Sequence, residues 1–244
     1  MAVEHGGNTY RLVMFDLDDT LAPSRVHCLT RWPAQLRRLL ERGLVCIISG
    51  GQFGQFDAQV LSRIGDDPNA ANLHLMPTCG TQYVRLWRLR LGRRSTPNTC
   101  PTTRSTHARC LESGAEELGL WEAQPWVRSW RDRGSLDHLQ CARTRRPRRR
   151  QGRLGPDGAK RKHCVRMRRN GSPDLEVRSG GSTSVDVTRK GIDKAYGARR
   201  PQWREILRPG TSPTSLFCGD RPRRGGNDRP VADLGSPRRR ARLA

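Results

Sequence analysis

The stretch RLVMFDLDDTLAPS, residues 11–24, decides the fold of this chain. An apolar run at residues 12–15 leads directly into carboxylates at Asp16, Asp18 and Asp19. Such a run, followed by the turn-like sequence Ala-Pro-Ser, predicts a buried strand whose end opens onto a loop. Asp16 and Asp18 are two residues apart, so we expect both side chains on the same side of the strand end. Because two neighbouring carboxylates repel unless a cation lies between them, the stretch predicts a metal site.

Strands and helices alternate in the segment that follows. Residues 31–43 and 51–65 space their apolar side chains along one helical face. The runs LVCIIS, residues 44–49, and LHLMPT, residues 73–78, are typical of strands that are buried on both faces. This alternation predicts an α/β fold with a doubly wound, Rossmann-like parallel sheet.

Regular patterning returns near the end of the chain. Residues 174–197 alternate apolar and polar side chains around a Gly-Gly pair, which predicts a hairpin that leads into a helix. The run SLFCGD, residues 215–220, predicts another short strand that ends in an acid. Ligands bind beyond the carboxyl ends of the strands in such sheets. Four side chains are therefore expected at one edge: Asp16, Asp18, Ser49 and Asp220.

The formal net charge of +23 is concentrated in two segments. Residues 84–172 hold 23 Lys and Arg against 7 Asp and Glu, a net charge of +16, and residues 221–244 hold 8 against 2, a net charge of +6. Residues 84–172 also show no apolar periodicity, and we expect this segment to be disordered because it cannot bury an apolar face.

Two interpretations of the basic segments compete with an enzymatic one. The charge would suit a nucleic-acid-binding protein, although the segments lack interleaved aromatic residues and a helix-turn-helix pattern. Alternatively, only 4 of the 46 basic residues are Lys, which is typical of a GC-rich gene read out of frame and would give an inactive product. In either case the Arg-rich segments predict non-specific binding of polyanions.

Several classes of protein are disfavoured by the sequence. The eight cysteines form no CxxC pair, which argues against a zinc site or a disulfide framework. No apolar run approaches the roughly 20 residues of a membrane span, and the first ten residues do not resemble a signal peptide. We therefore expect a cytoplasmic protein that does not interact with membranes.

Four motifs, in this order, resemble those of the haloacid dehalogenase superfamily of phosphohydrolases: DLDDT (16–20), IISGG (47–51), KGIDKAYG (190–197) and GD followed by GGND (219–228). The sequence around the last two is similar to the subgroup with an inserted α/β cap of class IIB, which contains phosphomannomutases and sugar-phosphate phosphatases. The resemblance implies a core formed by residues 1–83 and 174–244, with a cap at residues 84–173. The Arg-rich composition predicts that this cap is degraded or disordered.

The resemblance also implies roles for the acidic residues. Asp16 would be the nucleophile, and Asp18 would protonate the leaving oxygen and then activate water. Mg²⁺ would be bound by Asp16, by the backbone carbonyl of Asp18 and by Asp220. Asp228 would hold water molecules of the ion or orient Lys194.

A second group of residues would bind the phosphate. Thr20, Ser49 and Gly50 are expected to contact the transferring phosphoryl group, together with the backbone N–H of Gly51. Lys194 would neutralise the charge of this group and that of Asp16. The motif residues also have ordinary structural interpretations when taken singly: turn formers for Asp18 and Asp19, a helix cap for Ser49, an exposed helix position for Lys194 and an Asx-turn for Asp220.

The expected function is Mg²⁺-dependent hydrolysis of a small phosphorylated metabolite, a sugar phosphate, through an aspartyl-phosphate. A phosphomannomutase-like transfer is the alternative, because it uses the same residues and differs only in the acceptor of the phosphoryl group. The sequence leaves the oligomeric state open.

Overall fold

The computed structural model describes residues 2–22, 32–87, 90–95, 130–132, 136–140, 175–179, 184–199, 203, 215–220, 226–234 and 238–240. The chain divides into two compact units, one of which contains Met1–Thr96 and Asp193–Ala244 and the other Pro97–Ile192. These boundaries differ from the expected ones at residues 84 and 174. Helices in the described part of the chain lack the combination of length and hydropathy that a membrane span requires.

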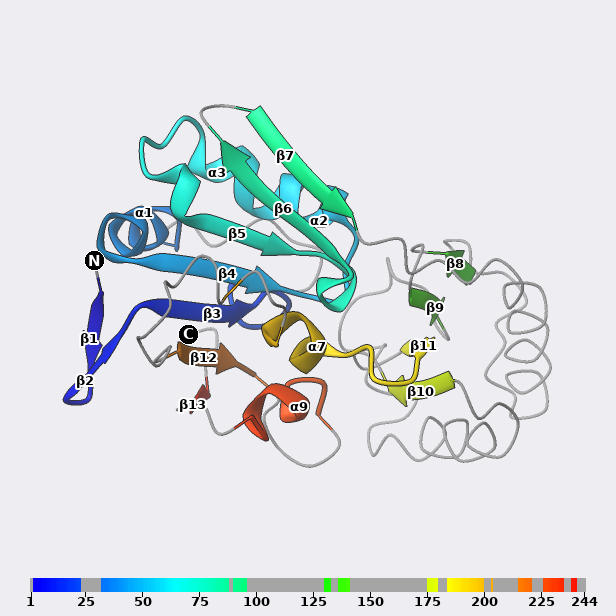
Figure 1. The fold of residues 1–244 in the computed structure, drawn as a ribbon. Helices are drawn as coiled ribbons and strands as arrows, with labels where there is room; N and C mark the ends of the chain where they lie inside the picture. The colour runs from blue at the N-terminus through cyan, green and yellow to red at the C-terminus, as the bar shows by residue number, and fades with distance from the viewer. Residues whose placement is uncertain are drawn as a thin grey trace, which may run out of the picture. The chain divides into compact units, whose positions relative to one another are not determined.

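A seven-stranded sheet forms the centre of the first unit, with the strand order β13-β12-β3-β4-β5-β6-β7 (Figure 1). Five of its strands are parallel: β3 (Leu12–Asp16), β4 (Leu44–Ile48), β5 (Leu73–Met76), β12 (Ser215–Gly219) and β13 (Arg238–Arg240). The predicted α/β fold with a doubly wound parallel sheet is therefore confirmed. The strand order reverses at β3, because the chain adds β4 and β5 on one side and later β12 on the other. In such sheets a ligand crevice lies at this switch point, beyond the carboxyl ends of the strands.

Both faces of β3, β4 and β5 are buried, as their apolar runs predicted. One face packs against α1 (Trp32–Arg42) and against a helical run that comprises α2 (Phe53–Phe56), a π-helical turn (Asp57–Leu61) and α3 (Ser62–Ile64). This cluster includes Leu36, Leu40, Val45, Ile47, Phe56, Val60, Ile64, Leu73 and Leu75. The opposite face forms a second cluster with Leu12, Met14, Cys46, Ile48, Met76, Tyr83, Trp203, Phe217 and Val231. Alternate residues of each strand thus enter alternate cores.

Two further strands extend the sheet where the sequence predicted the irregular segment to begin. β6 (Gln82–Trp87) pairs with β5, and β7 (Arg90–Ser95) pairs with β6, both antiparallel. The disorder expected for residues 84–172 does not extend to the residues that form these two strands. Pairing between strands uses backbone groups that every residue except proline carries, so it does not require the apolar pattern that β7 lacks.

The N-terminus contributes a hairpin that the sequence analysis did not predict. β1 (Val3–His5) pairs with β2 (Asn8–Tyr10), and the two residues between them are Gly6 and Gly7. Their φ angles are 57° and 75°. Positive φ at both central residues is the requirement of a two-residue hairpin turn, which explains the glycine pair.

The second unit contains a four-stranded antiparallel sheet in the order β10-β11-β9-β8. Its strands are β8 (Trp130–Asp132), β9 (Leu136–Gln140), β10 (Leu175–Ser179) and β11 (Ser184–Arg189). The predicted hairpin within residues 174–197 is confirmed as β10 and β11. The hairpin belongs to this four-stranded sheet, because residues 184–188 of β11 pair with β9. The Arg-rich run 143–153 and the helix-like segment 112–123 lie outside the described residues.

Candidate active site

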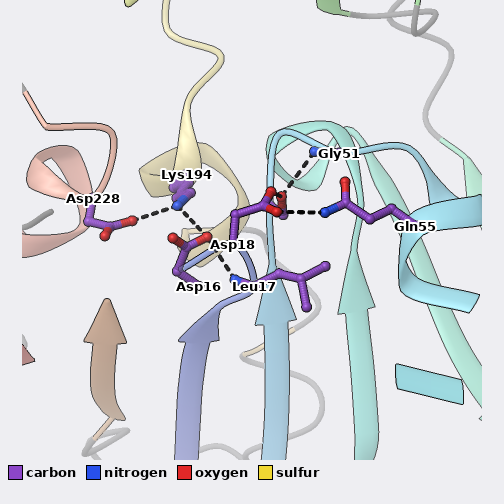
Figure 2. A network of polar contacts seen from close by, with 8 residues as sticks. Asp16, Leu17, Asp18, Gly51, Gln55, Lys194 and Asp228 are labelled. Carbon is purple, nitrogen blue, oxygen red and sulfur yellow. Dashed lines mark hydrogen bonds and ion pairs between the residues drawn. The ribbon is translucent and has the colours of Figure 1, made fainter. Parts of the chain in front are cut away.

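Asp16, the last residue of β3, is held in a fixed orientation. Asp16 is 1% exposed, and its Oδ1 accepts a hydrogen bond of 2.7 Å from the backbone N–H of Leu17. The chain then reverses, because Asp19 has a φ of 58° and its N–H donates to the carbonyl oxygen of Ala22 at 2.7 Å. The carboxylates of Asp16 and Asp18 point to different partners (Figure 2).

Lys194 brings a positive charge to Asp16. Its Nζ lies 2.6 Å from Oδ1 of Asp16 and 2.5 Å from Oδ1 of Asp228, and its side chain is 3% exposed (Figure 2). Lys194 is the first residue of α7 (Lys194–Ala198). The side chain of Asp193 caps this helix by accepting a hydrogen bond of 2.9 Å from the N–H of Tyr196. The motif around Lys194 therefore both starts the helix and directs the lysine to Asp16.

Two glycines allow α7 to approach the loops of the sheet closely. A Cβ atom at Gly197 would overlap the side chain of Ile48, and a Cβ atom at Gly80 would overlap the backbone of Gly197. Gly80 belongs to the short turn Thr78–Gly80, in which the N–H of Cys79 donates to the carbonyl oxygen of Ser49 at 2.9 Å. Close packing between glycines thus ties the helix that carries Lys194 to the loop after β4.

A cluster of three carboxylates lies at the switch point of the sheet. Asp16, Asp220 and Asp228 each offer an oxygen, and these oxygens all lie within 4.8 Å of one another. Asp228 precedes α9 (Arg229–Ala232) and is fully buried. A Cβ atom at Gly219 would overlap its carboxylate, so the glycine at the end of β12 makes room for Asp228.

Burial and neighbouring charges shift the pKa values of Asp16 and Lys194. Burial raises the pKa of Asp16 well above its usual value, the Lys194 ammonium opposes this increase, and Asp228 and Asp18 add to it. Burial alone would lower the pKa of Lys194, but the carboxylates of Asp16 and Asp228 raise it above the usual value, so Lys194 stays protonated.

The arrangement suits a divalent cation. Oδ2 of Asp16 is buried and has no hydrogen-bond partner within the described part of the chain, and two further carboxylates lie beside it. A buried polar atom without a partner is costly, and hard oxygen ligands of this kind are those that Mg²⁺ prefers. The residues that are present therefore fit the metal that the sequence predicted.

Hydrogen bonds hold the carboxylate of Asp18 outside the cluster of three carboxylates. Its Oδ2 accepts a hydrogen bond of 3.4 Å from Oγ of Ser49, and its Oδ1 accepts one of 2.8 Å from Nε2 of Gln55 (Figure 2). Oγ of Ser49 in turn accepts a hydrogen bond of 3.0 Å from the N–H of Gly51. The Asp18 carboxylate is thus held by the loop after β4 and by α2, and it does not belong to the cluster of three carboxylates.

The remaining predicted phosphate-binding residues lie at the same edge of the sheet. Thr20 follows β3, is 5% exposed and leaves its buried Oγ1 without a hydrogen-bond partner among the described residues. Gly50 lies between Ser49 and Gly51 in the loop after β4. The linker that includes Arg221, Arg223 and Arg224 lies outside the described residues.

The sequence analysis missed Gln55 and the glycine contacts. Gln55 and Gln59 are four residues apart, which indicates only that they can touch each other on a helix. Nothing in the sequence indicates that Gln55 reaches Asp18. The glycines of the motifs were noted, but not their contacts with one another.

Comparison with known proteins gave matches only among solved structures. No family model matches the chain, and no curated protein matches its sequence. The structure of N-terminally truncated Plasmodium falciparum IMP-nucleotidase is similar, with a TM-score of 0.64 and 15% identity over 94% of this chain and 65% of that one. The C-terminal domain of C. albicans trehalose-6-phosphate phosphatase gives a TM-score of 0.61 and 16% identity over 86% of this chain and 70% of that one. Aspergillus fumigatus trehalose-6-phosphate phosphatase gives a TM-score of 0.52 and 18% identity over 93% of this chain and 79% of that one.

These similarities establish the fold. The similar structures are an IMP-nucleotidase and two trehalose-6-phosphate phosphatases, and the likeness confirms the α/β fold that the sequence predicted. The subgroup with a class IIB cap is not decided by them. This chain spans 65% of the length of the truncated IMP-nucleotidase.

Proposed function

We propose that this chain is a Mg²⁺-dependent phosphatase that hydrolyses a small phosphomonoester through an aspartyl-phosphate on Asp16. The observation that carries the proposal is the position of Asp16. Its buried carboxylate lies 2.6 Å from the Lys194 ammonium and within 4.8 Å of the Asp220 and Asp228 carboxylates, at the switch point of a phosphatase fold.

In the first step, a carboxylate oxygen of Asp16 attacks phosphorus. The new O–P bond forms as the bond between phosphorus and the leaving oxygen breaks, and Asp18 donates a proton to that oxygen. The Leu17 N–H and Lys194 both bind Oδ1 of Asp16, which holds the carboxylate in one orientation for the attack.

In the second step, water attacks the phosphorus of the aspartyl-phosphate and passes a proton to Asp18. The O–P bond to Asp16 breaks, which releases inorganic phosphate and restores both aspartates to their initial state. Asp18 serves as acid and then as base, so one carboxyl group handles the proton in both steps.

The phosphoryl group would be held by groups from two loops. Thr20 follows β3, and Ser49, Gly50 and the backbone N–H of Gly51 follow β4. Lys194 adds a buried positive charge on the side of Asp16. Phosphoryl transfer depends mainly on such positioning and charge stabilisation.

Mg²⁺ would be bound by Asp16, Asp220 and the backbone carbonyl of Asp18, with Asp228 holding its water molecules or Lys194. The ion would supply positive charge for the phosphoryl oxygens during transfer. A metal that keeps several water molecules requires only a few protein oxygens, which agrees with the small number of acidic residues at the site.

The substrate class that we favour is a sugar phosphate. Two of the similar structures are trehalose-6-phosphate phosphatases, and others are an IMP-nucleotidase, two of them with bound IMP. Sugar phosphates and nucleoside monophosphates both carry one phosphate group on a polar, uncharged molecule. Residues 97–192 form the separate unit that would act as the cap and select among such substrates.

The proposal is tested by measuring phosphate release from a panel of sugar phosphates and nucleoside monophosphates, with Mg²⁺ and with EDTA. We expect release that requires Mg²⁺ and is strongest for one class of compound. Complete inactivity of the folded chain toward the panel and toward p-nitrophenyl phosphate would contradict the proposal.

A further inference from the structure

Gln55 makes a contact with Asp18 that neither the motifs nor the metal cluster accounts for. Its Nε2 donates a hydrogen bond of 2.8 Å to Oδ1 of Asp18, across 37 residues of sequence (Figure 2). Gln55 lies in α2, directly after the loop that carries Ser49 and Gly51. The helix therefore places an amide beside the carboxylate that would transfer the proton.

The amide of Gln55 is itself held in position. Nε2 also donates a hydrogen bond of 3.0 Å to Oε1 of Gln59, whose side chain is almost fully buried in the π-helical turn. Because a carboxylate and an amide oxygen both accept, the two N–H groups of Gln55 are directed to Asp18 and Gln59. Oε1 of Gln55 occupies the space into which a side chain at Gly51 would project. The glycine at position 51 thus leaves room for this orientation.

The contact determines where the Asp18 carboxylate points. One oxygen accepts from Gln55 and the other from Ser49, so both donors belong to the segment that follows β4. The carboxylate is consequently directed toward the phosphate-binding loop and away from the cluster formed by Asp16, Asp220 and Asp228. A general acid must face the leaving oxygen, which departs from the side of phosphorus opposite the nucleophile.

We infer that Gln55 is a positioning residue that orients the Asp18 carboxyl group for proton transfer to the leaving oxygen. The inference rests on the proposed phosphatase function and extends it. Gln55 touches Asp18 and not the reacting atoms, so its effect is exerted through Asp18. Gln59 supports the same arrangement by fixing the amide of Gln55.

The effect of losing this contact should depend on the leaving group. Phenyl phosphate releases a basic phenolate that benefits from protonation, whereas p-nitrophenyl phosphate releases a stabilised anion that leaves without a proton. The two compounds differ only by a nitro group, so they bind alike. A defect in the orientation of the acid should therefore slow phenyl phosphate hydrolysis selectively.

The experiment compares kcat for the two compounds in the wild type, Gln55→Leu and Asp18→Asn, with Ser62→Ala as a control. Ser62 lies on the same helical run and is exposed. We expect Gln55→Leu to lower kcat for phenyl phosphate about tenfold or more and kcat for p-nitrophenyl phosphate less than about threefold. KM should change little, and Gln55→Leu should add no further loss on the Asp18→Asn background.

The outcomes separate the inference from the proposed function. If the wild type hydrolyses neither compound, the proposed function fails and the inference with it. If the wild type is active and Gln55→Leu lowers both rates equally or leaves both unchanged, the inference is wrong and the function stands. Thermal unfolding monitors folding, and Gln55→Met, which has similar length but no N–H, replaces Gln55→Leu if that variant does not fold.

Discussion

The ammonium group of Lys194 lies 2.6 Å from the carboxylate of Asp16 and bridges it to Asp228, and all three side chains are buried. A single positive charge thus holds two carboxylates that reach the site from β3 and from the segment before α9. Because charges buried in this way are costly when left unpaired, the three residues depend on one another for stability as well as for the proposed chemistry.

Replacing Lys194 should destabilise the protein. Lys194→Met leaves Asp16 and Asp228 buried without their partner, and we expect the free energy of unfolding to fall by about 3–5 kcal/mol. Urea unfolding gives the measurement, with the exposed Lys190→Met as the matched control. Combining Lys194→Met with Asp228→Asn should recover part of the stability without restoring phosphate release. If Lys194→Met is as stable as Lys190→Met, the buried ion pairs do not contribute as described.

The contact between Gly80 and Gly197 should be sensitive to a single methyl group. Gly197→Ala would overlap Ile48 and displace α7, at a cost of about 1–3 kcal/mol, and it should also lower phosphate release because Lys194 moves with the helix. Gly54→Ala is the control, since that position lies in a helix with open space around it. It should be neutral or stabilising by about 0.5–1 kcal/mol. Equal stability of the two variants in thermal unfolding would show that α7 does not pack as described.

His74 should make the fold sensitive to acid. Burial, with a smaller contribution from Arg85, lowers the pKa of His74 to about 3, and its Nδ1 lies 2.7 Å from the hydroxyl oxygen of Tyr83. The unfolded chain binds a proton near pH 6.5 whereas the folded chain does not. Stability is therefore complete above that pH and falls as the pH decreases toward 3, by about 1.4 kcal/mol per pH unit.

The contribution of His74 can be isolated by comparing the wild type with His74→Phe. Unfolding free energies measured between pH 7 and 4 should decrease more steeply for the wild type, because the phenylalanine has no proton to bind. Parallel curves for the two proteins would show that His74 is not buried in its neutral form.

Mg²⁺ should stabilise the folded chain without any substrate. An ion that binds only the folded state at about 100 times its Kd adds about 2.7 kcal/mol, so the unfolding temperature should rise with Mg²⁺ and fall with EDTA. Asp220→Asn should weaken this response, whereas the exposed Asp57→Asn should keep it. A response that Asp220→Asn leaves intact would place the ion elsewhere.

Much of the fold could be predicted from the sequence, because parallel strands that are buried on both faces consist of continuous runs of apolar residues. The runs before Asp16, Ser49 and Asp220 mark three neighbouring strands, and the geometry of a parallel sheet then brings their carboxyl ends to one edge. The strands β6 and β7 were not predicted, because antiparallel strands near the edge of a sheet are stabilised by backbone pairing and need no continuous apolar run.

The candidate site was less accessible to prediction from the sequence. Asp16 and Asp18 were expected on the same side of the strand end, because residues two apart share a face of a strand. The strand ends at Asp16, and Asp18 contacts Ser49 and Gln55 and does not join the cluster of three carboxylates. The roles of Lys194 and Asp228 followed only from the family resemblance. The contact between Gln55 and Asp18 depends on how α2 packs over the loop after β4, and no local sequence pattern indicates that packing.

The central claim is that Asp16 forms a covalent bond to phosphorus. It is tested most directly by mixing the full chain with ³²P-labelled substrate and Mg²⁺, stopping the reaction in acid within milliseconds, and locating protein-bound label by peptide mapping. We predict label on the peptide that contains Asp16, release of that label by hydroxylamine, and loss of both label and phosphate release in Asp16→Asn. Phosphate release by Asp16→Asn at the wild-type rate, with no label on the Asp16 peptide of the wild type, would contradict the account.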